Sequence, residues 1–476
     1  MVYPAPVSVK EWKVLGAGIP WIHFVGIGGS GMSGVARVLL EQGYRVSGSD
    51  LRQSGLTADL ARLGAEIYLG HADANVRPGV TLVVVSTAIP RDNPEIVAAR
   101  SRGIPVISRG EMLARLMHAK KGIAVAGSHG KTTTTAMISL LMAAAGLDPT
   151  VIAGGVSEDI GGNARCGHSD YLVAEADESD GSFLLLTPWL AVVTNVEDDH
   201  LDYYGSLGGI HAAFGRFLEL VRPGGKAVVC LDDPVLAHLA GQAGQDSNIV
   251  SYGFKAGARY TAGMLHLNGR GSACTVYVDG SPRGELRLAV PGRHNILNAL
   301  AALAVAEACD IGFSRAQAIL AGFRGVRRRF QVLGRFGDIW VVDDYAHHPT
   351  EIRATLEAAS QVSAGRVIAV FQPHRFTRTR NLYREFGQCF GQAAEVIVTD
   401  IYPAGEPPIP GISAELIVAA ARENGHPAVK YMPREEEIVG YLAANSRPGD
   451  LIITLGAGDV YQVGHRLTDF LAGSRG

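Results

Sequence analysis

Short apolar runs alternate along the chain with longer segments in which apolar residues recur every three or four positions. The first block of this alternation has strand-like runs at 21–25 (WIHFV), 45–50 (RVSGSD) and 80–89 (VTLVVVSTAI), with a helical pattern at 31–43. It fades near 109–118. Strands that alternate with helices in this way predict a small parallel sheet covered by helices.

A second block repeats the pattern with different spacing. Its strand-like runs lie at 122–128, 171–177, 190–196, 226–232 and 248–254. Between 264 and 290 the pattern changes to short alternating runs with Asn-Gly and Asp-Gly turns, which predict an antiparallel addition to the sheet. An apolar helix is predicted at 294–309.

The third block begins around 334–349 and continues with strand-like runs at 366–371, 395–400, 428–432 and 450–459. It predicts another parallel open sheet. The fold class is therefore α/β. The chain has 476 residues, too many for one core. We predict three domains, with bounds 1–118, 119–326 and 327–476.

Charge and composition narrow the functional classes. The 43 Lys and Arg residues nearly balance 46 Asp and Glu residues, so no broad basic surface for nucleic acid or an anionic membrane is expected. The first twenty residues lack an export-signal pattern, and the uncharged run 132–147 is too short to span a bilayer, which predicts a cytoplasmic protein. Five scattered cysteines form no C-x-x-C pair, so we expect reduced thiols. Nothing in the spacing sets the number of subunits.

The stretch GIGGSGMSG, residues 26–34, follows the first strand-like run and opens a helix. Gly26, Gly28 and Gly31 fit the pattern G-x-G-x-x-G, and Asp50 ends the next strand 19 positions later, where a ribose hydroxyl is held in dinucleotide enzymes. The pattern predicts NAD. However, backbone N–H groups at a helix N-terminus bind any pyrophosphate, and UDP compounds carry one too.

A second glycine loop, GSHGKTTTT at 127–135, predicts a site for a nucleoside triphosphate. It departs from the usual P-loop because Val125 stands where the first glycine is expected, but the tail G-K-T is intact. Gly130 allows close backbone approach, Lys131 can lie between the β and γ phosphates, and Thr132 can offer its hydroxyl to Mg²⁺.

Acidic residues follow two other strands of the same block. EADESD, residues 175–180, ends one strand, and VTNVEDDH ends another at Asp199 and His200. Both would lie at the carboxyl edge of the sheet beside the second glycine loop, where open α/β sheets bind ligands. Because Mg²⁺ prefers carboxylate, phosphate and water oxygens, Glu175 is the candidate ligand.

The third block carries HHP at 347–349, the acidic pair Asp343 and Asp344, and FQPHRFTRTR at 371–380. Arginines at strand ends suit carboxylate or phosphate groups. Adjacent histidines on a loop can bind metal but more often make hydrogen bonds.

Taken together, GIGGSGMSG, GSHGKTTTT, EADESDGSF, TNVEDDH, PGRHNILNALAA, DDYAHHPTE and FQPHRFTRTR resemble the Mur ligase family, from about His23 to Gly464. The resemblance implies a Rossmann-like domain for a UDP-sugar, a central ATPase domain and a Rossmann-like domain for an amino acid. The closest likeness is to the branch that joins L-alanine to the muramoyl carboxylate of UDP-N-acetylmuramate. ATP and Mg²⁺ would activate the carboxylate as an acyl phosphate, which the amine attacks, in peptidoglycan precursor synthesis.

The resemblance also implies site residues. Those for ATP are Gly127, Ser128, His129, Gly130, Lys131, Thr132, Thr133, His294, Asn295, Arg329 and Asp344. Those for the UDP-sugar are Gly28, Gly29, Ser30, Gly31, Met32, Asp50, His71, Ser86, Thr87 and Arg109. Those for the amino acid and carboxylates are Tyr345, His347, His374, Arg375 and Arg378. Thr132, Glu175 and His200 would hold metal, and Lys131, Glu175, His200 and His374 would act in catalysis.

Three alternatives stay open at this point. A ligase that attaches a whole tripeptide to the same UDP-sugar is the nearest rival within the family, although EADESD favours the alanine branch. Residues 201–220 also contain no lysine, which argues against later-step ligases that use a carbamoylated lysine there. An NAD-dependent oxidoreductase would explain the first glycine loop alone, and a nucleotide-switch protein the second alone. If the three domains close over the substrates, we expect hinges near 118–122 and 325–328.

Overall fold

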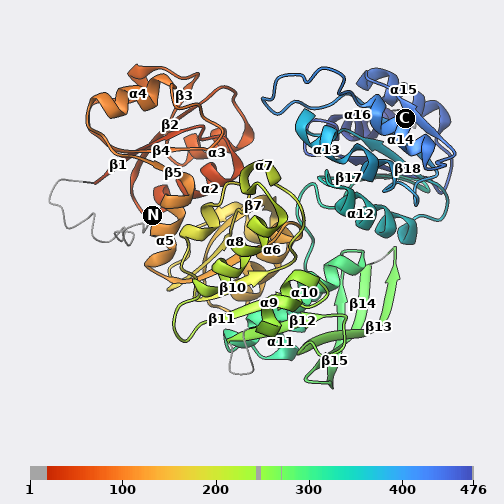
Figure 1. Ribbon diagram of the computed structural model, residues 1–476, viewed down its shortest axis with the longest axis horizontal. Helices are drawn as coiled ribbons and strands as arrows, with labels where there is room; N and C mark the ends of the chain where they lie inside the picture. The colour runs from red at the N-terminus through yellow and green to blue at the C-terminus, as the bar shows by residue number, and fades with distance from the viewer. Residues whose placement is uncertain (1–18, 243–247, 270, 474–476) are drawn as a thin grey trace. The chain divides into compact units, whose positions relative to one another are not determined.

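The computed structural model describes residues 19–242, 248–269 and 271–473. Residues 1–18, which make up most of the N-terminal stretch searched for an export signal, lie outside this range. Contacts divide the chain into two compact units (Figure 1). The first unit comprises residues up to Gly263 with Thr275–Leu286 and Leu297–Phe323, and the second comprises Met264–Cys274, Arg287–Ile296 and Arg324–Gly476.

The first unit begins with a five-stranded parallel sheet in the order β3-β2-β1-β4-β5. Its strands are β1 (Trp21–Val25), β2 (Arg45–Asp50), β3 (Glu66–Leu69), β4 (Val80–Val85) and β5 (Val106–Ser108), and its helices are α2 (Ser30–Glu41), α3 (Gly55–Arg62), η1 (Asp73–Asn75), α4 (Pro94–Ser101) and α5 (Arg109–His118). The strand predicted to reach residue 89 ends at Val85, because Ile89 N–H closes a turn onto Ser86 O at 3.1 Å. The strand order changes direction between β1 and β4, which is where open sheets of this kind bind ligands.

The central sheet has ten strands in the order β15-β14-β13-β12-β11-β10-β6-β9-β7-β8. They are β6 (Lys121–Ala126), β7 (Thr150–Ser157), β8 (Gly162–Arg165), β9 (Tyr171–Glu175), β10 (Leu190–Val193), β11 (Lys226–Cys230), β12 (Ile249–Gly253), β13 (Tyr260–Asn268), β14 (Gly271–Val278) and β15 (Ser281–Leu288). β6 pairs in parallel with β9 and β10. Only two residues connect β13 to β14 and β14 to β15, which requires antiparallel neighbours as predicted.

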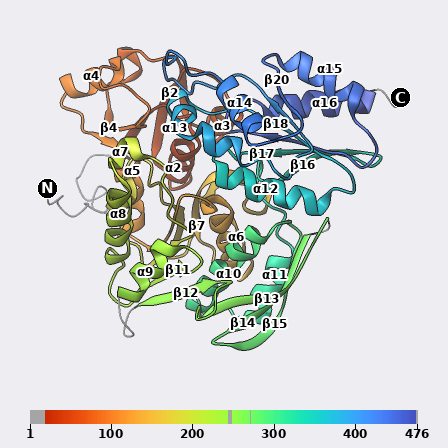
Figure 2. The ribbon, with the colours of Figure 1, turned by 45° about the vertical axis from the view of Figure 1, so that its right-hand side comes forward.

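Helices follow most strands of this sheet. They are α6 (Lys131–Ala144), η2 (Glu158–Ile160), η3 (Ser182–Leu185), α7 (Leu201–Tyr204), α8 (Leu207–Glu219), α9 (Pro234–Gln242), α10 (Arg293–Ala308) and α11 (Phe313–Ala321). Helix α6 packs against β6, β7 and β9, and Figure 2 labels it next to β7. Its residues from Thr132 to Met142 are nearly all buried, because both the sheet and α11 pack against it.

The third sheet, in the second unit, has the order β16-β17-β21-β18-β19-β20. Its strands are β16 (Gln331–Phe336), β17 (Ile339–Asp344), β18 (Val367–Phe371), β19 (Glu395–Val398), β20 (Val429–Tyr431) and β21 (Leu451–Leu455), with helices α12 (Pro349–Val362), α13 (Phe376–Gly387), α14 (Glu415–Glu423), α15 (Glu435–Asn445) and α16 (Tyr461–Gly473). Four of its five strand pairs are parallel, as predicted, and one edge strand departs from the pattern. β16 is antiparallel to β17, because a two-residue turn with Gly337 at φ +58° reverses the chain.

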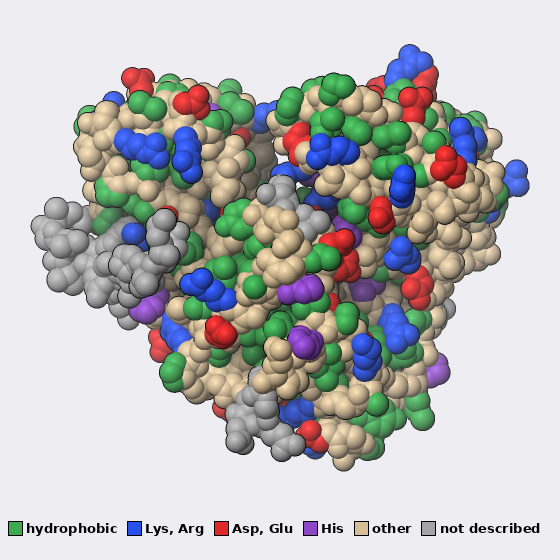
Figure 3. All heavy atoms as spheres, in the orientation of Figure 1, with side chains coloured by type: hydrophobic (Ala, Val, Ile, Leu, Met, Phe, Trp, Pro, Cys, Tyr) green, Lys and Arg blue, Asp and Glu red, His purple; other side chains and the backbone are tan. Residues whose placement is uncertain are grey.

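Other expectations from composition can be compared with the folded chain. All five cysteines are free thiols. Among the described residues, no helix combines the length and apolar character that crossing a bilayer requires. Lys, Arg, Asp and Glu side chains are interspersed over the face shown in Figure 3, without a large area of one sign.

Candidate functional site

The second glycine loop connects β6 to α6. Gly127 has φ +129°, and a Cβ there would lie 2.1 Å from Thr194 Oγ1, so only glycine fits. The backbone of Asn195 and its side chain hold the loop, since Asn195 O accepts from Ser128 N–H at 3.1 Å and Asn195 Oδ1 accepts from His129 N–H at 2.8 Å. The loop is thus fixed before helix α6 begins at Lys131.

Lys131 and Thr132 each contact a carboxylate from the EADESD segment. Lys131 Nζ donates to Glu178 Oε1 at 2.8 Å and to Gly127 O at 2.5 Å, and Thr132 Oγ1 donates to Glu175 Oε2 at 3.0 Å. His200 Nε2 lies 3.9 Å from Glu178 Oε1, and its backbone has φ +60°. The predicted residues Lys131, Thr132, Glu175 and His200 therefore gather at one place.

Glu178 belongs to this group, although it is not among the residues predicted from the sequence. Its side chain is buried, and among the described residues its Oε2 has no hydrogen-bond partner. Burial raises the pKa of Glu178 to about 7, although the Lys131 ammonium acts in the opposite direction. Burial would lower the pKa of Lys131, but the carboxylates of Glu178 and Glu175 outweigh it and raise that pKa. In the sequence, Glu178 is distinguished only by its place in the acidic segment EADESD.

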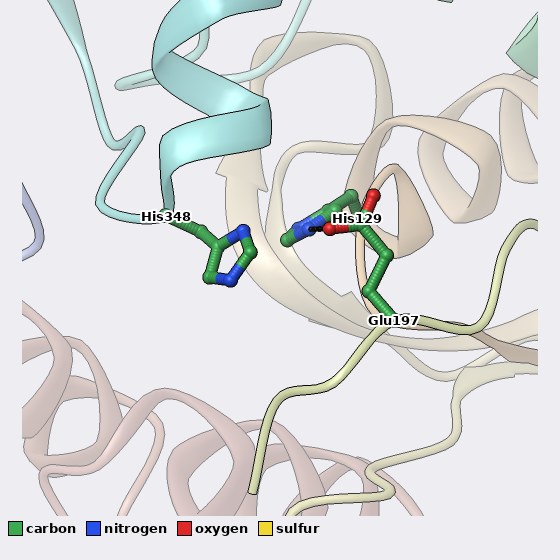
Figure 4. Close-up of side chains that lie close together, drawn as sticks. All are labelled: His129, Glu197 and His348. Carbon is green, nitrogen blue, oxygen red and sulfur yellow. Dashed lines mark hydrogen bonds and ion pairs between the residues drawn. The ribbon is translucent and has the colours of Figure 1, made fainter. Parts of the chain in front are cut away.

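His129, in the same loop, makes a second acidic contact. Its Nε2 lies 3.2 Å from Glu197 Oε2, and Figure 4 shows the imidazole beside that carboxylate. Ser128 Oγ accepts from the Glu197 backbone N–H at 2.8 Å. Figure 4 also labels His348, the residue that precedes α12 in the second unit. The loop therefore contacts the segment after β10 through both Asn195 and Glu197.

The first glycine loop lies at the carboxyl ends of β1 and β2. Gly28 N–H donates to Asp50 Oδ2 at 2.8 Å, and Arg52 N–H donates to Asp50 Oδ1 at 3.3 Å. Asp50 therefore holds the loop, at the position the sequence predicts for a ribose contact. Met32 is buried, so its side chain is part of the core, whereas Thr87 is exposed and Ser86 half-buried just after β4.

The two glycine loops are connected inside the first unit by contacts that sequence reasoning did not foresee. Ser30 Oγ donates to Gly154 O at 2.5 Å, and Gly154 N–H donates to Glu175 Oε2 at 2.8 Å. Arg109, predicted for the UDP-sugar, forms an ion pair of 2.9 Å with Asp177. The peptide groups of Gly154 thus lie between the first loop and the carboxylate next to Thr132.

In the second unit, Asp344 at the end of β17 connects the residue that precedes β16 with the turn that follows β17. Its carboxylate accepts from Phe330 N–H and Ala346 N–H, both at 2.7 Å. Burial raises the pKa of Asp344 to about 6, against the influence of Arg329. Arg329 Nη1 lies 3.4 Å from Glu351 Oε1, and burial, assisted by Arg329, lowers the pKa of His294 to about 4. The charges of Arg329 and Glu351 therefore act on both His294 and Asp344.

Aromatic rings and arginines meet at the start of α13. His374 stacks on Tyr402 with ring centroids 5.7 Å apart, and the His347 and His374 rings are also 5.7 Å apart. Arg378 Nη1 lies 3.4 Å from His374 Nδ1, and Arg375, with φ +72°, is the N-cap of α13. Burial lowers the pKa of His347 to about 3. The predicted residues lie together here, and Tyr402 is an addition.

Family profiles match all three parts of the chain. The Mur ligase family catalytic domain matches residues 21–121, the Mur ligase middle domain matches 125–306, and the Mur ligase glutamate ligase domain matches 328–458. The chain belongs to the Mur ligase family. The three matches correspond to the three sheets, although the sequence-based boundaries at 118 and 326 stay predictions.

Individual members of the Mur ligase family are similar over nearly the whole length. A protein of Pelotomaculum thermopropionicum named UDP-N-acetylmuramate--L-alanine ligase is 52% identical over 447 residues, 94% of this chain and 96% of the relative. The crystal structure of a UDP-N-acetylmuramate-alanine ligase from Thermotoga maritima has a TM-score of 0.82 at 32% identity, covering 95% and 99% of the two chains. A murein peptide ligase from Psychrobacter arcticus has a TM-score of 0.70 at 25% identity, with the same coverage.

Proposed function

We propose that this protein joins L-alanine to the muramoyl carboxylate of UDP-N-acetylmuramate at the expense of ATP, with release of ADP and phosphate. The observation that carries the proposal is the 52% identity over 94% of the chain to a relative named for this reaction. The amide would form in two steps. The muramoyl carboxylate would attack the γ-phosphorus to give an acyl phosphate, and the L-alanine amine would then displace phosphate from the acyl carbon.

The geometry around Lys131 supports phosphoryl transfer. Its ammonium and the backbone N–H groups of the loop at the N-terminus of α6 would stabilise the charge on the transferring group. The ammonium contacts Glu178 at 2.8 Å. Bound triphosphate would therefore compete with Glu178 for Lys131. Because the pKa of Glu178 is raised to about 7, this carboxyl group can take up a proton when Lys131 turns to a phosphate.

The side chains beside Lys131 fit a magnesium ion. Two carboxylates and one hydroxyl lie together, and Glu178 Oε2 is a buried oxygen without a hydrogen-bond partner among the described residues. Mg²⁺ prefers a few carboxylates with phosphate and water oxygens. Thr132 and Glu175 would hold it, with His200 near a second ion. When bound, Mg²⁺ would neutralise charge on the transferring phosphoryl group.

The remaining roles follow the predictions from the family resemblance. Residues of the first glycine loop, with Asp50, His71, Ser86, Thr87 and Arg109, would bind the UDP-sugar. His294, Asn295, Arg329 and Asp344 would contact the nucleotide. His374, Arg375 and Arg378, with Tyr345 and His347, would bind carboxylates of L-alanine and the muramoyl group. The stacking of His374 on Tyr402 gives this imidazole a fixed orientation, which supports its proposed role.

The alternatives receive less support. A solved structure named UDP-N-acetylmuramate:L-alanyl-gamma-D-glutamyl-meso-diaminopimelate ligase, a tripeptide-attaching enzyme, has 30% identity and a TM-score of 0.60 over 65% of this chain. The alanine ligase has 32% and 0.82 over 95% of this chain. Family membership disfavours an NAD-dependent oxidoreductase and a nucleotide-switch protein, since neither explains all three matched domains.

The deciding experiment measures phosphate release from ATP and Mg²⁺ with UDP-N-acetylmuramate, while L-alanine, glycine, L-serine or the tripeptide is added in turn. We expect release that needs both UDP-N-acetylmuramate and L-alanine, with a new UDP-product of matching mass. Release only with the tripeptide would identify the recycling reaction. Release without any UDP-sugar would support a nucleotide switch and contradict the proposal.

A further inference from the structure

A chain of buried polar side chains ends at His71, below the proposed UDP-sugar site. His71 follows β3, at the same sheet edge as Asp50 and the first glycine loop. Its side chain is 12% exposed, whereas Ser49 and Glu95 beneath it are fully buried. His71 is therefore the end of the chain that a ligand at this edge can reach.

Glu95 is the hydrogen-bond acceptor at the centre of this row of side chains. Its Oε1 accepts from Asn75 Nδ2 at 2.5 Å and from Ala72 N–H at 3.2 Å. Its Oε2 lies 2.5 Å from Ser49 Oγ and 3.4 Å from His23 Nε2. Burial would raise the pKa of Glu95, but hydrogen bonds from His23, Ser49 and Asn75 outweigh it and lower that pKa. The group is thus a carboxylate at neutral pH, with acceptors only.

The direction of the next hydrogen bond follows from this. Because the carboxylate has no proton to give, the Ser49 hydroxyl must donate to it across 2.5 Å. Because the Ser49 hydroxyl gives its one proton to Glu95, its oxygen can only accept in the 2.9 Å contact with His71 Nδ1. His71 Nδ1 must therefore carry a proton and donate it to Ser49 Oγ. Glu95 Oε2 itself lies 3.6 Å from Nδ1, so Ser49 is the direct partner. In neutral His71, Nε2 therefore carries a lone pair.

We propose that Glu95, acting through Ser49, fixes His71 as the Nδ1–H tautomer, so that Nε2 accepts a hydrogen bond from an N–H or O–H of the uridine part of the substrate. Ser49 and Glu95 are positioning residues. This inference rests on the proposed function, because it needs a uridine nucleotide at this sheet edge. The two donors of uridine that fit are N3–H of the base and the ribose hydroxyls. Cytosine offers no proton at N3, so a bond to N3–H also selects uracil against cytosine.

The first measurement is the tautomer of His71 in the ligand-free protein at pH 8, from the ¹⁵N chemical shifts of its ring nitrogens. A His71→Gln variant assigns the signal. We expect Nδ1 protonated in the wild type and a shift toward Nε2–H in Ser49→Ala. Ser139→Ala is the matched control, since Ser139 is equally buried but its hydroxyl donates to Thr135 O within α6. Protonation of Nε2 in the wild type, or an unchanged tautomer in Ser49→Ala, would overturn the proposal. The wild-type spectrum decides even if the variant does not fold.

The second measurement is calorimetric binding of UDP, CDP and 2′-deoxy-UDP. We expect Ser49→Ala to weaken UDP binding about tenfold, with ATP binding unchanged. If Ser49→Ala prefers UDP over CDP less strongly than the wild type does, N3–H is the donor. If it prefers UDP over 2′-deoxy-UDP less strongly than the wild type does, the donor is a ribose hydroxyl. If both preferences stay at wild-type values, the acceptor role of His71 is refuted. If no uridine nucleotide binds the wild type while His71 has the expected tautomer, the proposed function fails and the fixed tautomer stands.

Discussion

Replacement of Gly154 by alanine tests whether the position of Glu175 governs the reaction. Gly154 lies on β7, and a Cβ there would stand 2.4 Å from Glu175 Oε2 and 2.8 Å from its Cδ. Contacts under 3.0 Å force a shift, and ordinary contact begins at about 3.4 Å. The Glu175 carboxylate must therefore move by about 1 Å away from Gly154, which changes its position relative to Thr132. Gly154 itself has no positive φ, so alanine is compatible with the backbone.

The expected effect is large on turnover and small on stability. The carboxylate is the far end of a flexible side chain, so its displacement should change the free energy of unfolding by about 1 kcal/mol or less. A displacement of about 1 Å in a positioned group can lower the rate by about 100-fold. We therefore expect Gly154→Ala to lower kcat about 100-fold with nearly normal folding.

The assay is phosphate release at saturating ATP, UDP-N-acetylmuramate and L-alanine, combined with thermal unfolding of each variant. Gly241→Ala in α9 is the control, because a Cβ there meets no atom within 4 Å. It should keep wild-type turnover. Wild-type turnover in Gly154→Ala would refute the reasoning, as would a loss of activity explained by unfolding.

Three further predictions concern other parts of the site. Lys131→Ala should fold but lose about 100- to 1,000-fold in kcat, because it removes the cation beside the transferring group, and phosphate release measures this. Arg109→Ala should raise KM for the UDP-sugar about tenfold and leave KM for ATP unchanged, in steady-state kinetics. His294 and His347 have pKa values lowered to about 4 and 3, so the unfolded chain binds their protons more readily. Each histidine should therefore lower the free energy of unfolding by about 2 kcal/mol as the pH drops from about 8 to about 5, while the raised pKa values of Glu178 and Asp344 act in the opposite direction. Urea titrations should show the share of His294 as a difference between the wild type and His294→Asn that changes by about 2 kcal/mol between these two pH values.

The predictions from sequence were strongest where one local pattern determines the structure. Glycines between a strand and a helix indicate a phosphate-binding turn by themselves, and the structure has both loops at strand ends. Prediction was weaker where partners are distant in the chain. Nothing near Ser49 points to Glu95, 46 positions away, and nothing near Gly154 points to Ser30. Glu178 was missed because its neighbours in EADESD have the same chemistry, and only burial distinguishes it.

The edge strand β16 was missed for a related reason. Its residues are half-buried or exposed and lack a continuous apolar run, and the predicted third block begins only at about residue 334, inside this strand. Pairing with β17, supported by the turn at Gly337, makes it a strand. Local periodicity therefore identified the buried parallel strands better than this exposed antiparallel one.

The peptide groups of Gly154, which bond Ser30 on one side and Glu175 on the other, have a thermodynamic consequence. A ligand that alters the Ser30 contact also alters the position of Glu175. Binding of the UDP-sugar and binding of the triphosphate should therefore not be independent. Linkage requires reciprocity: the factor by which bound UDP-N-acetylmuramate changes the affinity for magnesium ATP equals the factor in the reverse direction. Two glycine loops on separate sheets would then behave as one cooperative system, and the order in which substrates load would follow from their concentrations.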